Sequence, residues 1–303
     1  MSWDDPSTEA FDRHRPLLFS IGYRMLGSVA DAEDVLQEAY LRWQSASREE
    51  IRSPKSYLSA VVTRLCIDKL RQARTRREEY VGSWLPEPLP TEAGSETDDV
   101  DALDLDETLS MAFLVLLESL SPIERAVFLL REVFDYDYAE ISQIVGKSEV
   151  NCRQITHRAH RSLAARRPRF ESSPEQEERL VESFIQACTH GDMENLVSLL
   201  AEDVTLWTDG GGKARAPLNP IYGREKVIRF FFSVLGKDSP AFLRRIWING
   251  QPGVAGYDAG GRPVGAGTLE VEEGRIRAMH FVVNPEKLAS VPQLTELGEK
   301  GRS

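Results

Sequence analysis

The distribution of charge along this chain limits how it can fold more than any other feature of the sequence. Residues 78–124 carry 13 acidic side chains and no Lys or Arg. The other residues before position 171 hold 22 basic and 16 acidic side chains, whereas residues 171–303 hold 15 and 19. Clustered positive charge attracts a polyanion even when the net charge of the chain is −11. The pattern predicts two basic modules, an acidic tether between them and a nearly neutral third domain.

The composition is that of a globular protein. Its 303 residues are 41% apolar, which suits two or three domains of about 100 residues each. No apolar run approaches the roughly 20 residues of a membrane span, and the acidic start is unlike a signal peptide, so we expect a cytoplasmic protein with no membrane partner. Cys66, Cys152 and Cys188 lie far apart in apolar contexts, which favours buried free thiols. We expect no metal and no cofactor.

The first basic module is predicted to be helical up to about residue 77. Between Ala32 and Trp43 apolar side chains recur every three or four positions, and acidic side chains fill the other faces. A second helix begins at Ser53-Pro54 and ends in a basic run, residues 71–77. Two helices of opposite charge in one small domain indicate two different partners.

Ser142, Gly146 and Cys152 have the spacing of a helix-turn-helix. The pattern needs a small residue where the helices approach, a glycine for the left-handed turn and an apolar residue that packs between the helices. Arg153 on the second helix suits bidentate pairing with guanine, and Arg161 suits a phosphate. The candidate DNA contacts on this helix are Glu149, Asn151, Arg153, His157, Arg158 and Arg161.

The remaining segments are a proline-rich linker and an α+β domain. Residues 84–90 contain too many prolines for a helix or a sheet. They form either a solvated tether or a segment that docks on another domain through Trp84, Leu85 and Pro86. After Pro174 the pattern predicts helices followed by an antiparallel meander of strands.

These residues together resemble the extracytoplasmic-function family of bacterial sigma factors, the promoter-reading subunits of RNA polymerase. Residues 31–43 are similar to the family's region-two helix, which docks on the polymerase clamp. Residues 56–71 are similar to the segment that reads the promoter −10 element, and residues 121–159 to region four, which reads the −35 element. The resemblance implies polymerase contacts by Asp31, Glu33, Asp34, Gln37 and Glu38, and −10 contacts by Arg64, Asp68, Lys69, Arg71 and Arg74.

The last third looks like a SnoaL-like domain with a cone-shaped α+β fold. Residues 84–88, 209–213 and 284–288 resemble the signatures of a sigma-factor subgroup in which this domain is fused to the sigma regions. The resemblance implies an intramolecular regulator, whose cavity could hold a small ligand that the sequence does not identify. The implied regulatory residues are Trp84, Leu85, Pro86, Asp209, Lys213, Asn284, Pro285 and Lys287.

The expected organisation follows from these segments. It comprises a region-two domain (1–80), an acidic linker (81–106), a region-four domain (107–170), a SnoaL-like domain (175–290) and a tail (291–303).

Two other classes of protein compete with the sigma-factor interpretation. A one-component transcription regulator would use the helix-turn-helix and a ligand-sensing domain, but it leaves residues 1–77 without a role. An enzyme would need a convergent acid/base pair, and the candidates Asp203, Asp209, Asp258 and His280 do not suggest one. We therefore expect a protein that is not an enzyme. Arg64 and the pair Asn151-Cys152 differ from the residues common in the family, which leaves the bases that are read open.

Overall fold

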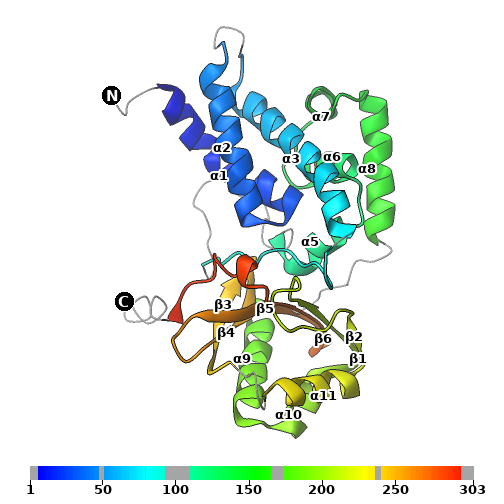
Figure 1. Ribbon diagram of the computed structural model, residues 1–303. Coiled ribbons are helices and arrows are strands. Elements are labelled where there is room, and N and C mark those ends of the chain that lie inside the picture. The colour runs from blue at the N-terminus through cyan, green and yellow to red at the C-terminus, as the bar shows by residue number, and fades with distance from the viewer. Residues whose placement is uncertain are drawn as a thin grey trace. The chain divides into compact units, whose positions relative to one another are not determined.

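The structure is a computed structural model. It describes residues 6–47, 51–78, 80–92, 109–164, 173–235 and 240–294. The chain forms two compact units (Figure 1): one contains residues 1–78 and 116–167, and the other contains residues 79–115 and 168–303.

The first unit is helical. Its helices are α1 (Pro6–Leu26), α2 (Val29–Ser45), α3 (Pro54–Glu78), α6 (Pro122–Glu132), α7 (Tyr138–Val145) and α8 (Glu149–Ala164). The short helix α5 (Met111–Leu117) precedes α6 in the chain. The apolar stripe predicted between Ala32 and Trp43 is buried on α2. Ser28 begins this helix by accepting a hydrogen bond from the Asp31 amide, 3.1 Å away.

The predicted helix-turn-helix is present. Asp137 and Glu140 form a capping box that begins α7, and Gly146 ends it in the left-handed region at φ +66°. Cys152 of α8 is fully buried between the two helices, in a cluster with Ile141 and other apolar residues.

The sigma-like helices of the two sequence regions share one core. The Tyr136 hydroxyl lies 2.7 Å from the hydroxyl of Ser59 on α3. Arg125 of α6 is buried, donates to the Met25 carbonyl oxygen at 2.7 Å and pairs with Glu118 at 2.8 Å. Burial lowers the pKa of Arg125 to about 9. Because a buried guanidinium is costly without partners, these contacts hold the two sets of helices in one arrangement.

The second unit is an α+β domain built on one six-stranded sheet in the described residues. Its strands are β1 (Leu200–Asp209), β2 (Ile221–Tyr222), β3 (Phe242–Ile248), β4 (Gln251–Tyr257), β5 (Pro263–Glu272) and β6 (Arg275–Val282), in the order β2-β1-β6-β5-β4-β3. The predicted antiparallel meander of β3 to β6 is confirmed. However, β1 pairs with β6 in parallel, so the sheet is mixed.

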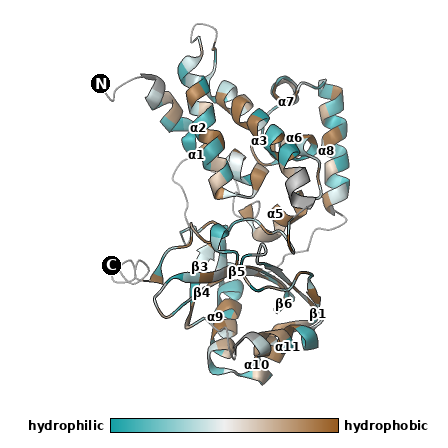
Figure 2. Cartoon of the chain, viewed as in Figure 1, coloured by the Kyte–Doolittle hydropathy of each residue, from teal (hydrophilic) through white to brown (hydrophobic). Residues whose placement is uncertain are grey.

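Each face of this sheet carries its own core. Three helices supply the core on the first face: α9 (Pro174–His190), α10 (Met193–Leu199) and α11 (Arg224–Leu235). Both α9 and α11 carry apolar and polar residues along their length, as Figure 2 shows. Phe184 of α9 packs there against Phe231 and Phe281. On the second face, Leu85 from the linker and Leu288, after the short helix η2 (Pro285–Lys287), are buried.

The described part of the expected linker packs on this second unit. The Thr91 amide donates to the Trp247 carbonyl oxygen at 3.0 Å, and the Asn249 amide donates to the Leu89 carbonyl oxygen at 2.8 Å. Pro90 lies between these bonds, opposite Ile248. Residues 89–91 therefore extend the sheet beyond its edge strand β3. The prediction that these prolines exclude a sheet is wrong for residues 89–91. Proline lacks an N–H, but a strand at the edge of a sheet does not need that group where it faces away from its neighbour.

The left-handed turn at Gly146 gives a direct test of the helix-turn-helix. Replacing Gly146 by Ala should destabilise the first unit by about 1–2 kcal/mol, because an L side chain is disfavoured at this φ. The new Cβ would meet nothing within 4 Å, so the cost is in the backbone alone. Gly146→Asn should cost less. Urea denaturation of the three proteins measures the difference, and equal midpoints for Gly and Ala would contradict the assignment.

Candidate functional site

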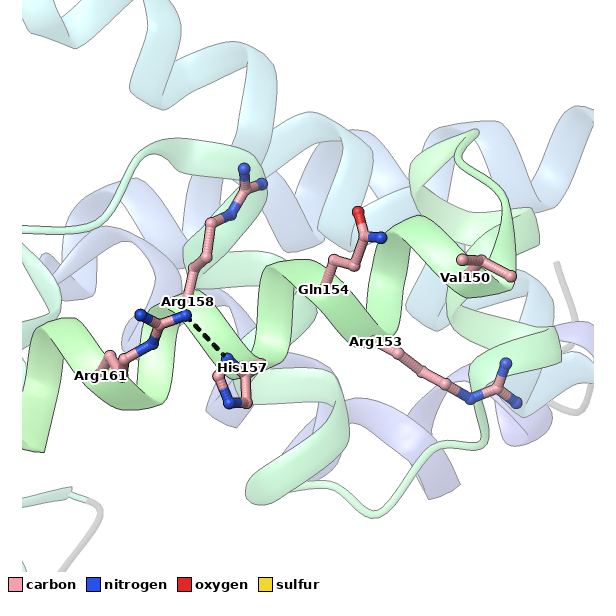
Figure 3. Close-up of a pocket in the computed structure, with 6 residues that line it drawn as sticks. All are labelled: Val150, Arg153, Gln154, His157, Arg158 and Arg161. Atoms are coloured by element: carbon pink, nitrogen blue, oxygen red, sulfur yellow. Dashed lines mark hydrogen bonds between the residues drawn. The ribbon is translucent and has the colours of Figure 1, made fainter.

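The exposed face of α8 is a candidate for a DNA-reading surface. It lines a shallow depression of about 440 Å³ with Val150, Arg153, Gln154, His157, Arg158 and Arg161 (Figure 3). Four of these residues were predicted from the sequence. Val150, whose side chain is 63% exposed, and Gln154 were missed, although helical spacing from Arg153 and His157 would have found both. An exposed apolar group suits a thymine methyl, and a glutamine suits adenine.

Arg153 is held in place on this surface. Its guanidinium lies 3.1 Å from the Glu149 carboxylate and 4.9 Å from the centre of the Tyr138 ring. Arg161 lies 3.4 Å from the His157 ring, as the dashed line in Figure 3 marks. In the structure Glu149 therefore orients Arg153, whereas the sequence suggested that Glu149 itself contacts DNA. A guanidinium held in this way loses less freedom when it binds a base.

The residues predicted to contact the −10 element lie along α3, and several already have partners. Arg64 donates to the Ile144 carbonyl oxygen at 2.9 Å and to the Gln143 carbonyl oxygen at 2.7 Å, at the C-terminal end of α7. That end of a helix carries negative partial charge, which attracts a guanidinium. Asp68 and Arg71 pair at 3.3 Å. The Arg74 side chain lies outside the described part of the chain.

The predicted polymerase-binding carboxylates lie on α2. Lys69 of α3 pairs with Asp31 at 2.7 Å and with Asp34 at 3.1 Å. Burial lowers the pKa of Lys69, but its hydrogen bonds to Asp31 and Asp34 outweigh this and raise it. The structure thus pairs Lys69, which the sequence assigned to the −10 element, with Asp31 and Asp34, which it assigned to polymerase.

Of the other three predicted polymerase-binding residues, Glu33 and Gln37 border a groove and Glu38 does not. Glu33 pairs with Arg15 at 2.6 Å and Glu38 with Arg42 at 2.9 Å, whereas Gln37 is exposed. Glu33, Asp34 and Gln37 line a groove of about 460 Å³ between α1 and α2.

A second candidate site is the linker clamp in the second unit, in which the buried residues Asp209, Lys287 and Leu85 meet the partly buried Tyr80 and Trp84. Asp209 is fully buried and accepts hydrogen bonds from the Tyr80 hydroxyl (2.6 Å), the Leu85 amide (2.9 Å) and Lys287 (2.7 Å). Lys287 also donates to the Leu85 carbonyl oxygen and lies 4.2 Å from the centre of the Trp84 ring. The side chains of this buried ion pair thus contact Trp84 and Leu85 of the linker, and Tyr80 just before it.

The other regulatory residues implied by the resemblance surround the clamp. Asn284 donates to the Tyr80 hydroxyl at 3.1 Å, and Pro285 begins η2. Lys213 forms an exposed ion pair with Glu286. Pro86 is buried. Burial and the neighbouring Asp209 raise the pKa of Tyr80. Tyr80 was missed because a lone tyrosine beside a basic run carries no motif.

The run of glycines after Asp209 has a steric reason. A Cβ at Gly211 would lie 2.3 Å from the side-chain nitrogen of Asn284 and 2.8 Å from the Tyr80 hydroxyl. Glycine therefore allows these three segments to meet.

The residues considered for catalysis do not converge. His280 is buried 3.3 Å from Glu270, and burial lowers the pKa of His280 to about 4 and raises that of Glu270 to about 7. Asp203 pairs with Arg277 on the surface, and Asp258 holds the amides of its own turn. In the described residues, no group of three or more His, Cys, Asp or Glu is placed to hold a metal ion. The three cysteines are free and buried, as predicted.

A mixed polar and apolar depression of about 480 Å³ lies where α9 ends and β3 begins, lined in part by Cys188, Phe242 and Arg244. Nothing in it identifies a ligand, and the ligand stays a prediction. None of the described helices combines the length and the apolar character that crossing a membrane requires.

Comparisons with known proteins agree with this architecture. Residues 10–76 match the family model of sigma-70 region 2, and residues 110–163 match that of sigma-70 region 4. The ECF RNA polymerase sigma factor SigJ of Mycobacterium tuberculosis is 36% identical, with 93% of each chain covered. The probable ECF sigma factor SigI of that species is 32% identical over 98% of this chain and 99% of its own. The crystal structure of SigJ superposes with a TM-score of 0.76 at 32% identity, covering 94% of this chain and 99% of that one.

The protein is therefore a sigma factor with two helical sigma regions and a C-terminal α+β domain. Within that class, it belongs to the family of ECF RNA polymerase sigma factors related to SigJ and SigI. It directs transcription initiation and is not an enzyme, and its sigma domains imply binding to RNA polymerase and promoter DNA. The match of residues 10–76 to region 2 favours a sigma factor over a one-component regulator, which would have no role for these residues.

The linker clamp makes a prediction about stability. Lys287→Met leaves the Asp209 carboxylate buried without its cation, which should destabilise the second unit by about 3–5 kcal/mol. The double variant with Asp209→Asn should recover part of this loss, because it leaves no buried charge. Denaturation monitored by tryptophan fluorescence measures both effects. Lys213→Ala, which removes an exposed pair, is the matched control and should cost at most about 1 kcal/mol. Equal losses for Lys287→Met and Lys213→Ala would contradict the role of the clamp.

Proposed function

We propose that α8 reads the promoter −35 element, that the basic part of α3 reads the −10 element and that the acidic face of α2 docks on core RNA polymerase. Three observations support these roles: the exposed basic face of α8, the groove beside α2 and the family of the chain. The fixed guanidinium of Arg153 favours a base contact over a phosphate contact. We also propose that the protein works in the cytoplasm, where RNA polymerase acts.

We further infer that the first unit opens when it binds a promoter. The centres of elements at −35 and −10 lie about 85 Å apart along B-form DNA, at 3.4 Å per base pair. Arg64 on α3 lies 2.7 Å from a carbonyl oxygen of α7, which is the other helix of the DNA-reading motif. If α3 lies over the −10 element and the helix-turn-helix over the −35 element, α3 and α7 are too far apart to touch. Their contact therefore belongs to a closed form of the protein.

We propose that the C-terminal domain regulates the sigma regions by holding the linker that joins them. The linker clamp supports this role, because it uses a buried ion pair where a passive tether would be solvated. The expected acidic stretch, including Asp98, Asp99 and Asp101, lies outside the described residues. We keep for it the proposal that its negative charge occupies a positively charged channel of the polymerase.

One comparison tests regulation by the C-terminal domain. Run-off transcription with purified core polymerase is measured for the full chain and for a chain that ends after Pro174. The shortened protein should start at the same promoter but at a changed rate, because DNA recognition stays with α3 and α8 while the hold on the linker is lost. Identical rates would contradict the regulatory role, and no specific start by either protein would contradict the sigma assignment.

The base contact of Arg153 is tested by substitution. Arg153→Ala should lose about 1–3 kcal/mol of binding at one base pair of the −35 element, if the guanidinium pairs with guanine. Binding is measured against −35 elements changed at one position at a time. Arg131→Ala, which removes another arginine beside the Tyr138 ring but lies off α8, is the control. A uniform loss across all the sequences would mean that Arg153 contacts a phosphate.

A further inference from the structure

Asn249 is a buried side chain in a position that is usually exposed. With Gly250 it makes the turn between β3 and β4, and both residues have positive φ, +56° and +73°. Asn-Gly is the preferred pair for such a hairpin turn, whose side chains normally face water. Asn249 is fully buried. Its burial therefore needs a reason other than the turn.

The reason is that its side chain joins two distant parts of the linker. The side-chain oxygen of Asn249 accepts a hydrogen bond from the Leu89 amide at 3.0 Å, and its side-chain nitrogen donates to the Leu109 carbonyl oxygen at 3.1 Å. The Gly250 amide adds a bond to the Thr91 hydroxyl at 3.1 Å. One amide group thus ties together both ends of the acidic stretch.

This tie shortens the connection between the two DNA-reading modules. The 20 residue-to-residue steps from Leu89 to Leu109 would span up to about 66–72 Å if extended. In the structure the backbone at both ends lies within 3.1 Å of one side chain. The connection from the end of α3 at Glu78 to α5 is therefore effectively shorter, because the stretch between Leu89 and Leu109 adds nothing to its reach.

We propose that Asn249 limits the reach of the linker and thereby determines which spacings between the −10 and −35 elements the protein accepts. The inference rests on the proposed reading of these elements by α3 and α8. Each added base pair moves the elements about 3.4 Å further apart and turns one relative to the other by about a tenth of a helical turn. A short connection penalises such changes, whereas a connection lengthened by 20 residues absorbs them.

Two substitutions separate the tie from the turn. Asn249→Gly keeps the positive φ that the hairpin needs and removes both side-chain bonds. Asn249→Asp also tolerates positive φ and keeps an acceptor for the Leu89 amide, but it places an oxygen against the Leu109 carbonyl and releases that end alone. Glu273→Gly is the matched control, because Glu273 has φ +52°, precedes Gly274 in the hairpin between β5 and β6, and is exposed.

The experiment is run-off transcription by core polymerase with each full-length protein, on promoters that differ only in spacer length, in steps of one base pair. The unmodified protein and Glu273→Gly should share one sharp optimum. In Asn249→Gly and Asn249→Asp, transcription from the longest spacers should rise about fivefold relative to the optimum, because the freed linker reaches further. Hydrogen exchange should show a faster Leu89 amide in Asn249→Gly and a protected one in Asn249→Asp.

The outcomes are distinguishable. Spacer profiles that are the same for all four proteins overturn the inference, and so does a loss that is uniform over all the spacers, which would give Asn249 a purely structural role. In both cases the unmodified protein still transcribes, so the proposed promoter contacts stand. If the unmodified protein made no specific transcript from any spacer, those contacts would be overturned together with the inference.

Discussion

The guanidinium of Arg64 lies within 3 Å of two carbonyl oxygens at the end of α7. Around this contact, Tyr136 bonds to Ser59 and the buried Arg125 bonds to the backbone of α1. Two modules that act about 85 Å apart on DNA under the proposed function are thereby packed into one unit. Since Tyr136, Ser59 and Arg125 each have a hydrogen-bond partner in the other module, separation exposes these groups together, and the packed form is a defined state rather than a loose encounter.

The second unit holds the linker with interactions of unequal strength. Exposed pairs such as Lys213 with Glu286 contribute at most about 1 kcal/mol, because water screens them. The pair of Asp209 with Lys287 is buried, so loss of either partner leaves a charge that water cannot reach. Asn249 holds both ends of the acidic stretch by neutral hydrogen bonds, which are individually weaker. The linker is thus fixed firmly at Leu85 and more reversibly at Leu109.

The sequence predicted the features that depend on local residue patterns. It could not predict the features that depend on contacts between segments far apart in the chain. The stripe on α2, the turn at Gly146 and the meander after β3 follow from periodicity and turn residues. The parallel pairing of β1 with β6 does not, since nothing local records which distant strand is a neighbour. For the same reason Tyr80 and Asn249 went unnoticed, and so did the ion pair of Lys69 with Asp31.

We infer that α3 and the helix-turn-helix separate when the protein binds a promoter with polymerase. Energy transfer between dyes at two introduced cysteines, Gln72→Cys on α3 and Lys147→Cys in the turn, measures that separation directly. Both positions are exposed, whereas Cys66, Cys152 and Cys188 are buried and should not be labelled. We predict efficient transfer in the free protein and its loss in a complex that transcribes. Efficient transfer that persists in such a complex would contradict the account.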